Sequence, residues 1–286
     1  MPRPNLTGVW RANGRPLQVE LVDEPRPEGL LTEEERAVRD MVRDWVDEEV
    51  MPVINHHYME HTFPTDLIPK MGELGFFGAN LPEEYGCAGL NNVAYGIINQ
   101  ELERGDSGLR SFSSVQGALV MYPIYAFGSE EQRQHWLPKM ATGEVIGCFG
   151  LTEPDFGSNP GGMLTRAVKD GDEWILNGAK MWVTNGASAD IVLMMVRTDE
   201  ATDRKGSRGI GAFLVPTDAE GYIPGKKEPK MGLRGSETVA VTMQDLRLGP
   251  EGQAFVIEAN ATPDIADDED FALSAARGRL SYPKLL

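Results

Sequence analysis

The spacing of apolar residues changes once along this chain, close to Gly143. Before that residue, apolar side chains recur every three or four positions, which is the period of one helix face. After it, they gather in short runs separated by turn residues such as Asn177-Gly178, a pattern typical of strands. The helical pattern covers 32–51, 66–74, 92–104, 115–127 and 129–141. The strand pattern covers 145–151, 165–169, 173–176, 180–184, 191–197, 211–215, 239–248 and 254–259. This order predicts an α+β fold, in which an N-terminal all-helical domain precedes an antiparallel β-sandwich or barrel.

Local signals mark the ends of these elements. Thr32 with Glu35, and Ser129 with Gln132, fit the capping box, so each pair predicts the start of a helix. Pro52 is expected to end the first helix, because proline has no amide hydrogen to donate. We predict an extended lead-in (1–31), a helical domain (32–143), a middle β-domain (144–248) and an atypical, acidic tail (249–286).

The charge balance excludes some classes of partner. The 286 residues include 27 basic and 44 acidic side chains, so the formal net charge is −17. Because a phosphate backbone attracts cations, a chain this acidic is not expected to bind nucleic acid. Cys87 and Cys148 are too few for a disulfide framework or a four-cysteine zinc site. The sequence shows neither an apolar signal segment nor an uncharged apolar run long enough to span a bilayer, which predicts a cytoplasmic protein.

Three histidines lie close together after the first helical pattern. His57 and His61 have the spacing that places two imidazoles on one face of a helix, and His56 is adjacent. However, Pro52 and Pro64 argue against a helix there, and a third strong ligand is missing, so no metal site is predicted. Signatures for a nucleophilic serine, a Rossmann phosphate loop and a P-loop are also missing.

Two segments of the β-half combine apolar, aromatic and hydroxyl side chains. Residues 149–158 (FGLTEPDFGS) leave a strand, and residues 181–186 (MWVTNG) alternate as a strand, so that Trp182 and Thr184 share one face. A flat heteroaromatic cofactor needs an apolar surface and a hydroxyl aimed at its polar edge, and Trp182, Thr184 and Thr152 can supply both. On composition alone, packing of Trp182 within the sheet core is the simpler alternative.

Together, these segments resemble the flavin-binding signatures of the acyl-CoA dehydrogenase family. Residues 110–116 (RSFSSVQ) and 128–132 (GSEEQ) are similar to the glutaryl-CoA dehydrogenase branch of that family. The resemblance runs from about residue 30 to residue 247 and implies a helical domain, a middle β-domain and FAD as cofactor. By this resemblance, the residues that line FAD are Phe149, Leu151, Thr152, Gly157, Ser158, Trp182, Val183 and Thr184.

The same resemblance implies an acyl-CoA substrate with a short, dicarboxylic acyl chain. Arg110 matches the guanidinium that pairs with the distal carboxylate in the glutaryl-CoA branch, and a planar, permanently charged fork suits a carboxylate. Ser111 and Ser114 complete this polar end, and Ser158 lies where the thioester arm enters. A salt bridge on the helix surface is the alternative for Arg110.

The family reaction removes an α-proton with a carboxylate base while a hydride leaves the β-carbon for the flavin. In the family this base is a glutamate of a C-terminal helical domain, and no glutamate of this chain matches it. The catalytic base is therefore unknown, and Glu153 belongs to the flavin motif rather than to that position. The resemblance further implies an electron-transfer flavoprotein as electron acceptor and a homo-oligomer. A non-catalytic module that binds flavin or acyl-CoA is the alternative function.

The tail departs from this family. Residues 249–260 (GPEGQAFVIEAN) resemble the last strand of ATP-grasp ligases such as D-alanine–D-alanine ligase. That resemblance implies Glu258 and Asn260 as magnesium ligands, and oxygens two positions apart on a strand face the same way. A fragment of an ATP-grasp ligase is accordingly the third function hypothesis.

Overall fold

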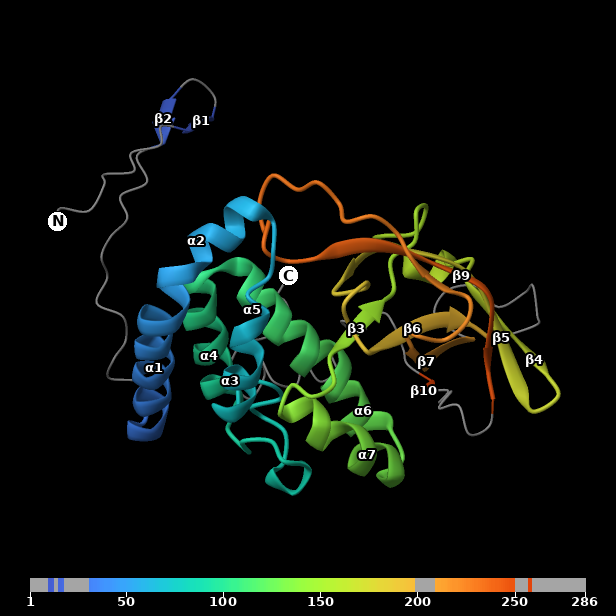
Figure 1. The fold of residues 1–286 in the computed structure, drawn as a ribbon, viewed down its shortest axis with the longest axis horizontal. Coiled ribbons are helices and arrows are strands. Elements are labelled where there is room, and N and C mark those ends of the chain that lie inside the picture. Colours follow the sequence, from blue (N-terminus) through green and yellow to red (C-terminus); the bar gives the residue numbers. More distant parts are fainter. Residues whose placement is uncertain (1–9, 13–14, 18–30, 199–208, 250–256, 259–286) are drawn as a thin grey trace.

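The structure, a computed structural model, describes residues 10–12, 15–17, 31–198, 209–249 and 257–258. The helices gather on one side and the long strands on the other (Figure 1). The predicted fold class, with a helical part followed by a β-part, is therefore confirmed. In the lead-in, β1 (Trp10–Ala12) and β2 (Arg15–Leu17) pair as an antiparallel hairpin.

The two predicted capping boxes stand at the starts of the first and the last helix of the helical part. Thr32 and Glu35 bond reciprocally at the start of α1, and Ser129 and Gln132 do so at the start of α7. The α-helices are α1 (Glu33–Trp45), α2 (Met51–Glu60), α3 (Ile68–Glu73), α4 (Asn92–Gly105), α5 (Ser107–Ser114), α6 (Tyr122–Phe127) and α7 (Glu130–Ala141). Short 3₁₀ turns are η3 (Thr65–Leu67), η4 (Glu83–Tyr85) and η6 (Pro160–Gly162).

The expectation that Pro52 ends the first helix is wrong. The helix continues through a π-helical turn, η2 (Val46–Val50), into α2, whose first turn contains Pro52. The Met51 amide donates to the carbonyl five residues back, and this wider spacing resets the hydrogen-bond pattern just before the proline. Pro52 then stands in a first helical turn, where a missing donor costs little. A second π-helical turn, η5 (Val115–Met121), precedes Pro123 in α6 in the same way.

The continuation of α2 also changes the environment of the histidines. His56 and His57 are helical, against the expectation from sequence, and His61 ends the helix with a φ of 56°. Across the described ranges, no group of three histidine, cysteine, aspartate or glutamate side chains is arranged to hold a metal ion. None of the described helices is both long enough and apolar enough to cross a membrane.

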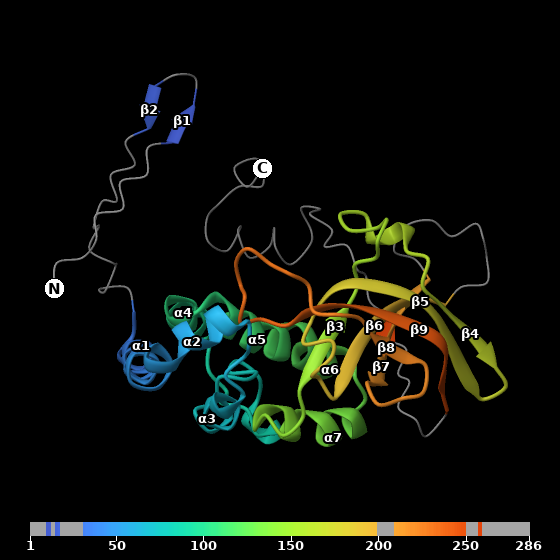
Figure 2. The same ribbon diagram turned by 45° about the horizontal axis from the view of Figure 1, so that its top comes forward.

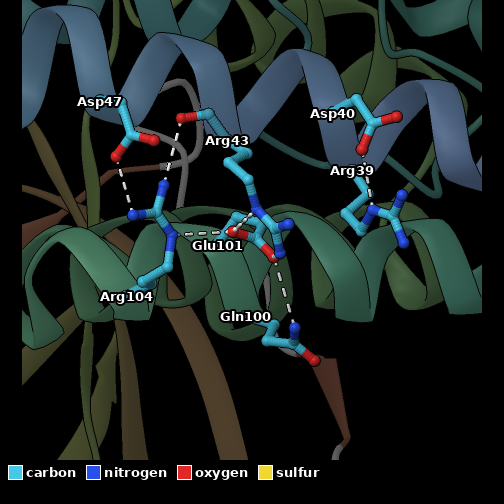
Figure 3. Close-up of polar contacts among 7 residues, drawn as sticks. All are labelled: Arg39, Asp40, Arg43, Asp47, Gln100, Glu101 and Arg104. Carbon is cyan, nitrogen blue, oxygen red and sulfur yellow. Dashed lines mark hydrogen bonds and ion pairs between the residues drawn. The ribbon is translucent and has the colours of Figure 1, made fainter. Parts of the chain in front are cut away.

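A buried carboxylate ties α1 to α4 (Figure 3). Glu101 of α4 is fully buried and accepts hydrogen bonds from Arg43 of α1, at 2.7 and 3.1 Å, and from Arg104, at 2.9 Å. Arg104 also donates to Asp47 at 2.8 Å. Burial by itself raises the pKa of Glu101, but the bonds from both arginines outweigh it and the net pKa is lowered. The carboxylate therefore stays ionised and holds the two helices together.

The β-part is a single curled sheet rather than two packed sheets (Figure 2). Its strands are β3 (Gly147–Gly150), β4 (Arg166–Asp170), β5 (Glu173–Thr184), β6 (Ile191–Arg197), β7 (Ile210–Pro216), β8 (Tyr222–Pro224), β9 (Thr238–Leu248) and β10 (Ile257–Glu258). The order across the sheet is β10-β7-β6-β4-β5-β9-β8, with β3 beside β6. Most pairs are antiparallel, as predicted, but β3 and β4 both run parallel to β6. Every residue of β6 is buried, so this strand forms the centre of the core.

The turn expected at Asn177-Gly178 is absent, because β5 passes through it as one strand of 12 residues. Asn177 instead exchanges two hydrogen bonds with Asp245 of β9, where the pairing shifts register. Gly178 has a φ of 146°, and a Cβ atom there would lie 2.6 Å from Oγ1 of Thr165. These residue types thus serve a β-bulge and a close approach rather than a turn.

Two further strands, β8 and β10, lie at the two ends of the sheet order. β8 has three residues and was not predicted. Of the strand predicted over 254–259, the structure describes Ile257 and Glu258, which pair with β7. The predictions for Asn260, for the side chain of Glu258 and for the acidic tail lie outside the described residues.

One buried amide joins the two parts of the molecule. Gln116, in η5, donates to the carbonyl oxygens of Met140 at 3.0 Å and Val145 at 2.8 Å. Its own oxygen accepts from the Gly147 amide at 2.7 Å, at the start of β3. This side chain therefore satisfies the backbone where the chain passes from helices to sheet.

Candidate functional site

The two segments singled out in the sequence lie side by side in the fold. After β3, residues 151–165 rise over the sheet and include the short helix η6 (Figure 2). Where this loop begins, the Thr152 carbonyl accepts a hydrogen bond of 2.7 Å from the Met181 amide of β5. The start of the 149–158 segment is thereby joined to the strand that carries Trp182.

A buried ion pair holds the loop on the sheet. Lys180 is fully buried and donates to Glu153 Oε1 at 2.9 Å and to the Leu151 carbonyl at 3.0 Å. Glu153 also accepts from the backbone amides of Leu164 and Thr165, at 2.6 and 3.0 Å. One carboxylate thus connects both ends of the loop with β5, a role that sequence reasoning missed.

Burial and bonding act on this pair in opposite directions. Burial alone raises the pKa of Glu153, but bonds from Thr165, Leu164 and Lys180 outweigh it, so the net pKa is lowered. Burial lowers the pKa of Lys180, and Glu153 offsets that change only in part. Because its oxygens are committed to the loop, Glu153 serves as an anchor for structure.

Trp182 stands on the surface in a strained conformation. Its φ is 60° and the residue is 56% exposed. Lys180 pairs with Val241 and Val183 with Val239, so two residues, Met181 and Trp182, lie opposite Ala240 alone. A positive φ is costly for a bulky side chain, and such strain is concentrated at functional sites. The alternative of a tryptophan packed inside the sheet is wrong.

Two threonine hydroxyls belong to the segments that meet at this part of β5. Thr184 follows Trp182 on the same face of β5, while Val183 between them is buried. Thr152 is half-buried where its segment contacts β5. Within the described ranges, neither hydroxyl makes a hydrogen bond to protein. Both are therefore free to bond a ligand.

The other expected cofactor residues fall into two groups. Phe149 and Leu151 are half-buried and pack against the hydrophobic core, so they hold the start of the 149–158 segment on the sheet. Gly157 and Ser158 are exposed further along the loop. Asn185, which follows Thr184, has a φ of 63° and a buried Nδ2 without a partner in the described part of the chain.

A pocket of about 460 Å³ lies between the loop and the sheet. It is formed by residues 153–156 and 164–165 together with β5 and β9, and Thr242 and Gln244 contribute polar side chains. Trp182 and Thr184 are not part of this lining. The pocket is therefore separate from the surface formed by Trp182, Thr184 and Thr152, which is called the Trp182 surface below. Sequence reasoning missed Thr242 and Gln244 because exposed polar residues alternate in any strand with one buried face.

Arg110 lies on α5 and already has an acidic neighbour. Its Nε donates to Glu103 at 2.6 Å, and its Nη1 lies 3.4 Å from the Ser114 hydroxyl. Ser114 in turn donates to the carbonyl of Ser111, so the three expected substrate residues are adjacent. Nη2 of Arg110 has no bond within the described residues. The helix-surface ion pair weighed from the sequence is therefore present, and one edge of the guanidinium remains open.

The order of a helical part and a curled, mainly antiparallel sheet defines the class of this protein. The family description "Acyl-CoA dehydrogenase, N-terminal domain" matches residues 32–144, and "Acyl-CoA dehydrogenase, middle domain" matches residues 148–246. The chain therefore belongs to the acyl-CoA dehydrogenase family, of which it carries the N-terminal and middle domains.

Relatives with known names agree with this assignment. The chain is 40% identical to the mitochondrial short-chain specific acyl-CoA dehydrogenase of Rattus norvegicus, over 79% of this chain and 56% of that protein. A glutaryl-CoA dehydrogenase from Mycobacterium smegmatis, solved in complex with FADH2, is 47% identical, covers 80% of this chain and 57% of its own, and has a TM-score of 0.74. Butyryl-CoA dehydrogenase from Megasphaera elsdenii is 31% identical, with coverages of 80% and 60% and a TM-score of 0.74. The chain spans less than two thirds of the length of each.

Proposed function

We propose that the Trp182 surface binds FAD and that the protein takes part in the α,β-dehydrogenation of a short, dicarboxylic acyl-CoA. Membership of the acyl-CoA dehydrogenase family supports the reaction, and the FADH2 complex of the Mycobacterium relative supports the cofactor. The observation that carries the proposal is the strained, exposed Trp182 together with Thr152 and Thr184, whose hydroxyls make no hydrogen bond to protein within the described residues. An apolar plate with free hydrogen-bonding groups at its edge fits a flat, polar-edged ring.

Each residue has a separate task in this proposal. Trp182 supplies the apolar surface, Thr152 and Thr184 bond the polar edge of the ring, and Phe149, Leu151 and Val183 support these positions from the core. The exposed pair Gly157 and Ser158 allows the rest of the cofactor and the thioester arm to approach the loop. Bound FAD would accept the hydride that leaves the β-carbon of the acyl chain. Holding the reactants in one geometry is the main contribution of such a surface.

The environment of Arg110 supports the proposal of a dicarboxylic substrate. Glu103 occupies Nε, and the remaining edge of the guanidinium has one long contact, to Ser114. A carboxylate can bind this edge through two parallel hydrogen bonds, while the bond to Glu103 holds the fork in position. Ser111 and Ser114 add hydroxyls beside it.

A second candidate substrate has an uncharged, straight chain. It is favoured by the same ion pair, because a guanidinium already neutralised by Glu103 leaves less charge for a second carboxylate. The names of the rat and Megasphaera relatives point in this direction as well. The two candidates differ in what removal of Arg110 should do.

Ligand binding by the full chain tests the proposal. Titration with FAD should shift the flavin absorbance band, and unchanged free-flavin spectra at saturating protein would refute the proposal. With FAD bound, Arg110→Ala should weaken glutaryl-CoA binding about tenfold or more, the cost of a charged hydrogen bond, and butyryl-CoA binding much less. Arg133→Ala, which removes an arginine from a comparable ion pair with Glu130 on α7, is the matched control. Equal losses for both acyl-CoAs in Arg110→Ala would favour the uncharged substrate.

Turnover separates the enzyme from a binding module. In the family the base is a glutamate of a C-terminal helical domain, and no glutamate of the 286 residues matches it, so we expect these 286 residues to bind FAD and acyl-CoA without turning over glutaryl-CoA with an artificial electron acceptor. Measurable turnover would show that a carboxylate of this chain acts as the base. In the complete reaction, an electron-transfer flavoprotein is the proposed electron acceptor. Assembly into a homo-oligomer is also proposed, and both proposals are supported by membership of the acyl-CoA dehydrogenase family.

A further inference from the structure

The loop between β8 and β9, residues 225–237, is basic although the chain as a whole is acidic. Its cationic residues are Lys226, Lys227, Lys230 and Arg234. In both views this loop reaches from the sheet to the region of α2 and α5 (Figures 1 and 2). It is therefore a link between the two parts of the molecule.

Contacts with α2 hold the loop at its far side. Lys227 donates to the carbonyl of His61, and the Tyr58 hydroxyl lies 3.4 Å from the carbonyl of Met231. The guanidinium of Arg234 stacks 5.4 Å from the centre of the Tyr58 ring. An anchored loop can keep a charge at a constant place, which an unattached one cannot.

Lys230 differs from the other cations because it turns back toward the sheet. It is half-buried, and its ammonium donates to the carbonyl of Ser236 at 2.6 Å and to the Thr238 hydroxyl at 2.7 Å. It forms no ion pair with a carboxylate among the residues that the structure describes. A partly desolvated cation whose partners are neutral keeps its full charge and can attract a negative charge on a nearby ligand.

The register of the sheet places this ammonium at the Trp182 surface. Thr238 of β9 pairs directly with Thr184 of β5, and Val239 pairs with Val183. Directly opposed side chains of an antiparallel pair lie on the same face and about 5 Å apart. The hydroxyl that Lys230 bonds is therefore beside the Thr184 hydroxyl, on the face that carries Trp182.

Two neighbouring charges act on the Lys230 ammonium in opposite directions. Glu237 is an acidic residue whose charge acts on Lys230, but its carboxylate accepts from the Ala187 amide at 2.8 Å and from the Ser188 hydroxyl. Burial, and then repulsion by Lys227, lower the pKa of Lys230, while Glu237 raises it. Among the residues that the structure describes, no ion pair neutralises the ammonium that bonds Thr238.

We infer that Lys230 is an electrostatic positioning residue of the flavin surface, which orients the Thr238 hydroxyl and favours the reduced cofactor over the oxidised one. The inference rests on the proposed function. A hydride from the β-carbon brings two electrons and one proton, so the reduced ring carries one more negative charge than the oxidised ring. A cation behind Thr184 stabilises that extra charge, and for a separation near 10 Å at an effective dielectric of about 20 the effect is about tenfold in affinity.

The test compares the affinities of the full chain for oxidised and dithionite-reduced FAD without oxygen. In Lys230→Met, the ratio of reduced to oxidised affinity should fall about tenfold, which corresponds to about 30 mV for a two-electron couple. Lys230→Arg should keep most of the ratio. Lys226→Met removes an exposed cation from the same loop and should leave the ratio unchanged.

Each outcome decides a different point. If Lys230→Met weakens both redox states equally, Lys230 is merely structural and the inference is wrong. Equal ratios in Lys230→Met and Lys226→Met would also overturn it. Lys230→Gln, which keeps a donor for Thr238, carries the same expectation should the methionine variant fail to fold. If the unmodified chain binds FAD in neither state, the proposed function fails and this inference fails with it.

Discussion

Replacement of Glu153 by glutamine should destabilise the protein far more than the change in size suggests. The side chain is 4% exposed and bonds Lys180, which is itself fully buried. Glutamine offers one acceptor oxygen where the carboxylate serves the ammonium and the amides of Leu164 and Thr165. The change leaves a buried ammonium without its counter-charge and one amide without an acceptor. Breaking a buried pair in this way costs about 3–5 kcal/mol.

A double-variant cycle shows how much of that loss belongs to the pair. Lys180→Met removes the ammonium and should itself destabilise the protein, because Glu153 then keeps only its two backbone donors. In Glu153→Gln/Lys180→Met no uncompensated charge remains, so the double variant should lose less than the sum of the single variants. The difference should be about 2 kcal/mol, within the range of directly bonded neighbours. Additive losses would refute the view that the two charges stabilise each other.

The pH dependence gives an independent check. The folded-state pKa of Glu153 lies below the value of about 4.3 for an unfolded chain. Its contribution to the free energy of unfolding is therefore complete above pH 4.3 and disappears as the pH falls through the folded-state pKa. Glu153→Gln should lose this part of the acid dependence. An unchanged acid dependence would show that other carboxylates account for it.

Urea unfolding followed by tryptophan fluorescence measures these differences, and FAD affinity measures their effect on the site. Glu101→Gln is the control, since it alters a second buried carboxylate, which bonds two partly exposed arginines between α1 and α4, away from the loop. Both variants should be destabilised. We expect Glu153→Gln to weaken FAD binding and Glu101→Gln to leave it unchanged under conditions in which both are folded. Equal effects on FAD would mean that the loop anchor has no special part in binding.

Two smaller predictions follow from local geometry. Gly178→Ala should destabilise the β-part by about 2–3 kcal/mol, because the new Cβ would meet Thr165 at 2.6 Å. Gly171→Ala, where a Cβ would meet nothing within 4 Å, should cost about 1 kcal/mol. Midpoints of urea unfolding measure the difference, and equal losses in the two variants would refute the contact. Thr32→Ala should cost about 1 kcal/mol by removing the cap that bonds Glu35, and Thr32→Ser should restore the melting temperature; no change in the alanine variant would mean that the cap is not used.

Sequence patterns predicted those parts of the fold that depend on neighbours in the chain. Both capping boxes are confirmed, because a cap needs only residues three positions apart. The succession of a helical part and a β-part is confirmed, but helix α5 and strand β8 are not indicated by the sequence pattern. The prediction for Pro52 is wrong because the effect of a proline depends on the turn before it, and η2 shifts the hydrogen bonds so that the ring fits.

Contacts between residues that are distant in the sequence could not be predicted from local sequence patterns. Asn177 and Gly178 are typical turn residues, and only the pairing with Asp245 and the closeness of Thr165 show that they belong inside a strand. The anchor made by Glu153 and Lys180 joins residues 27 positions apart. The resemblance to a family identified the exposed tryptophan segment, but the bulge that exposes Trp182 depends on the register with β9.

The proposed site draws on both parts of the molecule, so its geometry depends on how they are joined. Arg110 belongs to α5 in the helical part, and Trp182 belongs to β5 in the sheet. Gln116 ties the helical chain that continues from α5 to the start of β3, and its amide is fully buried with both ends bonded. The loop 225–237 makes a second, separate connection through Tyr58. Two connections at different places resist rotation between the parts better than one, and a substrate that contacts both parts needs that resistance.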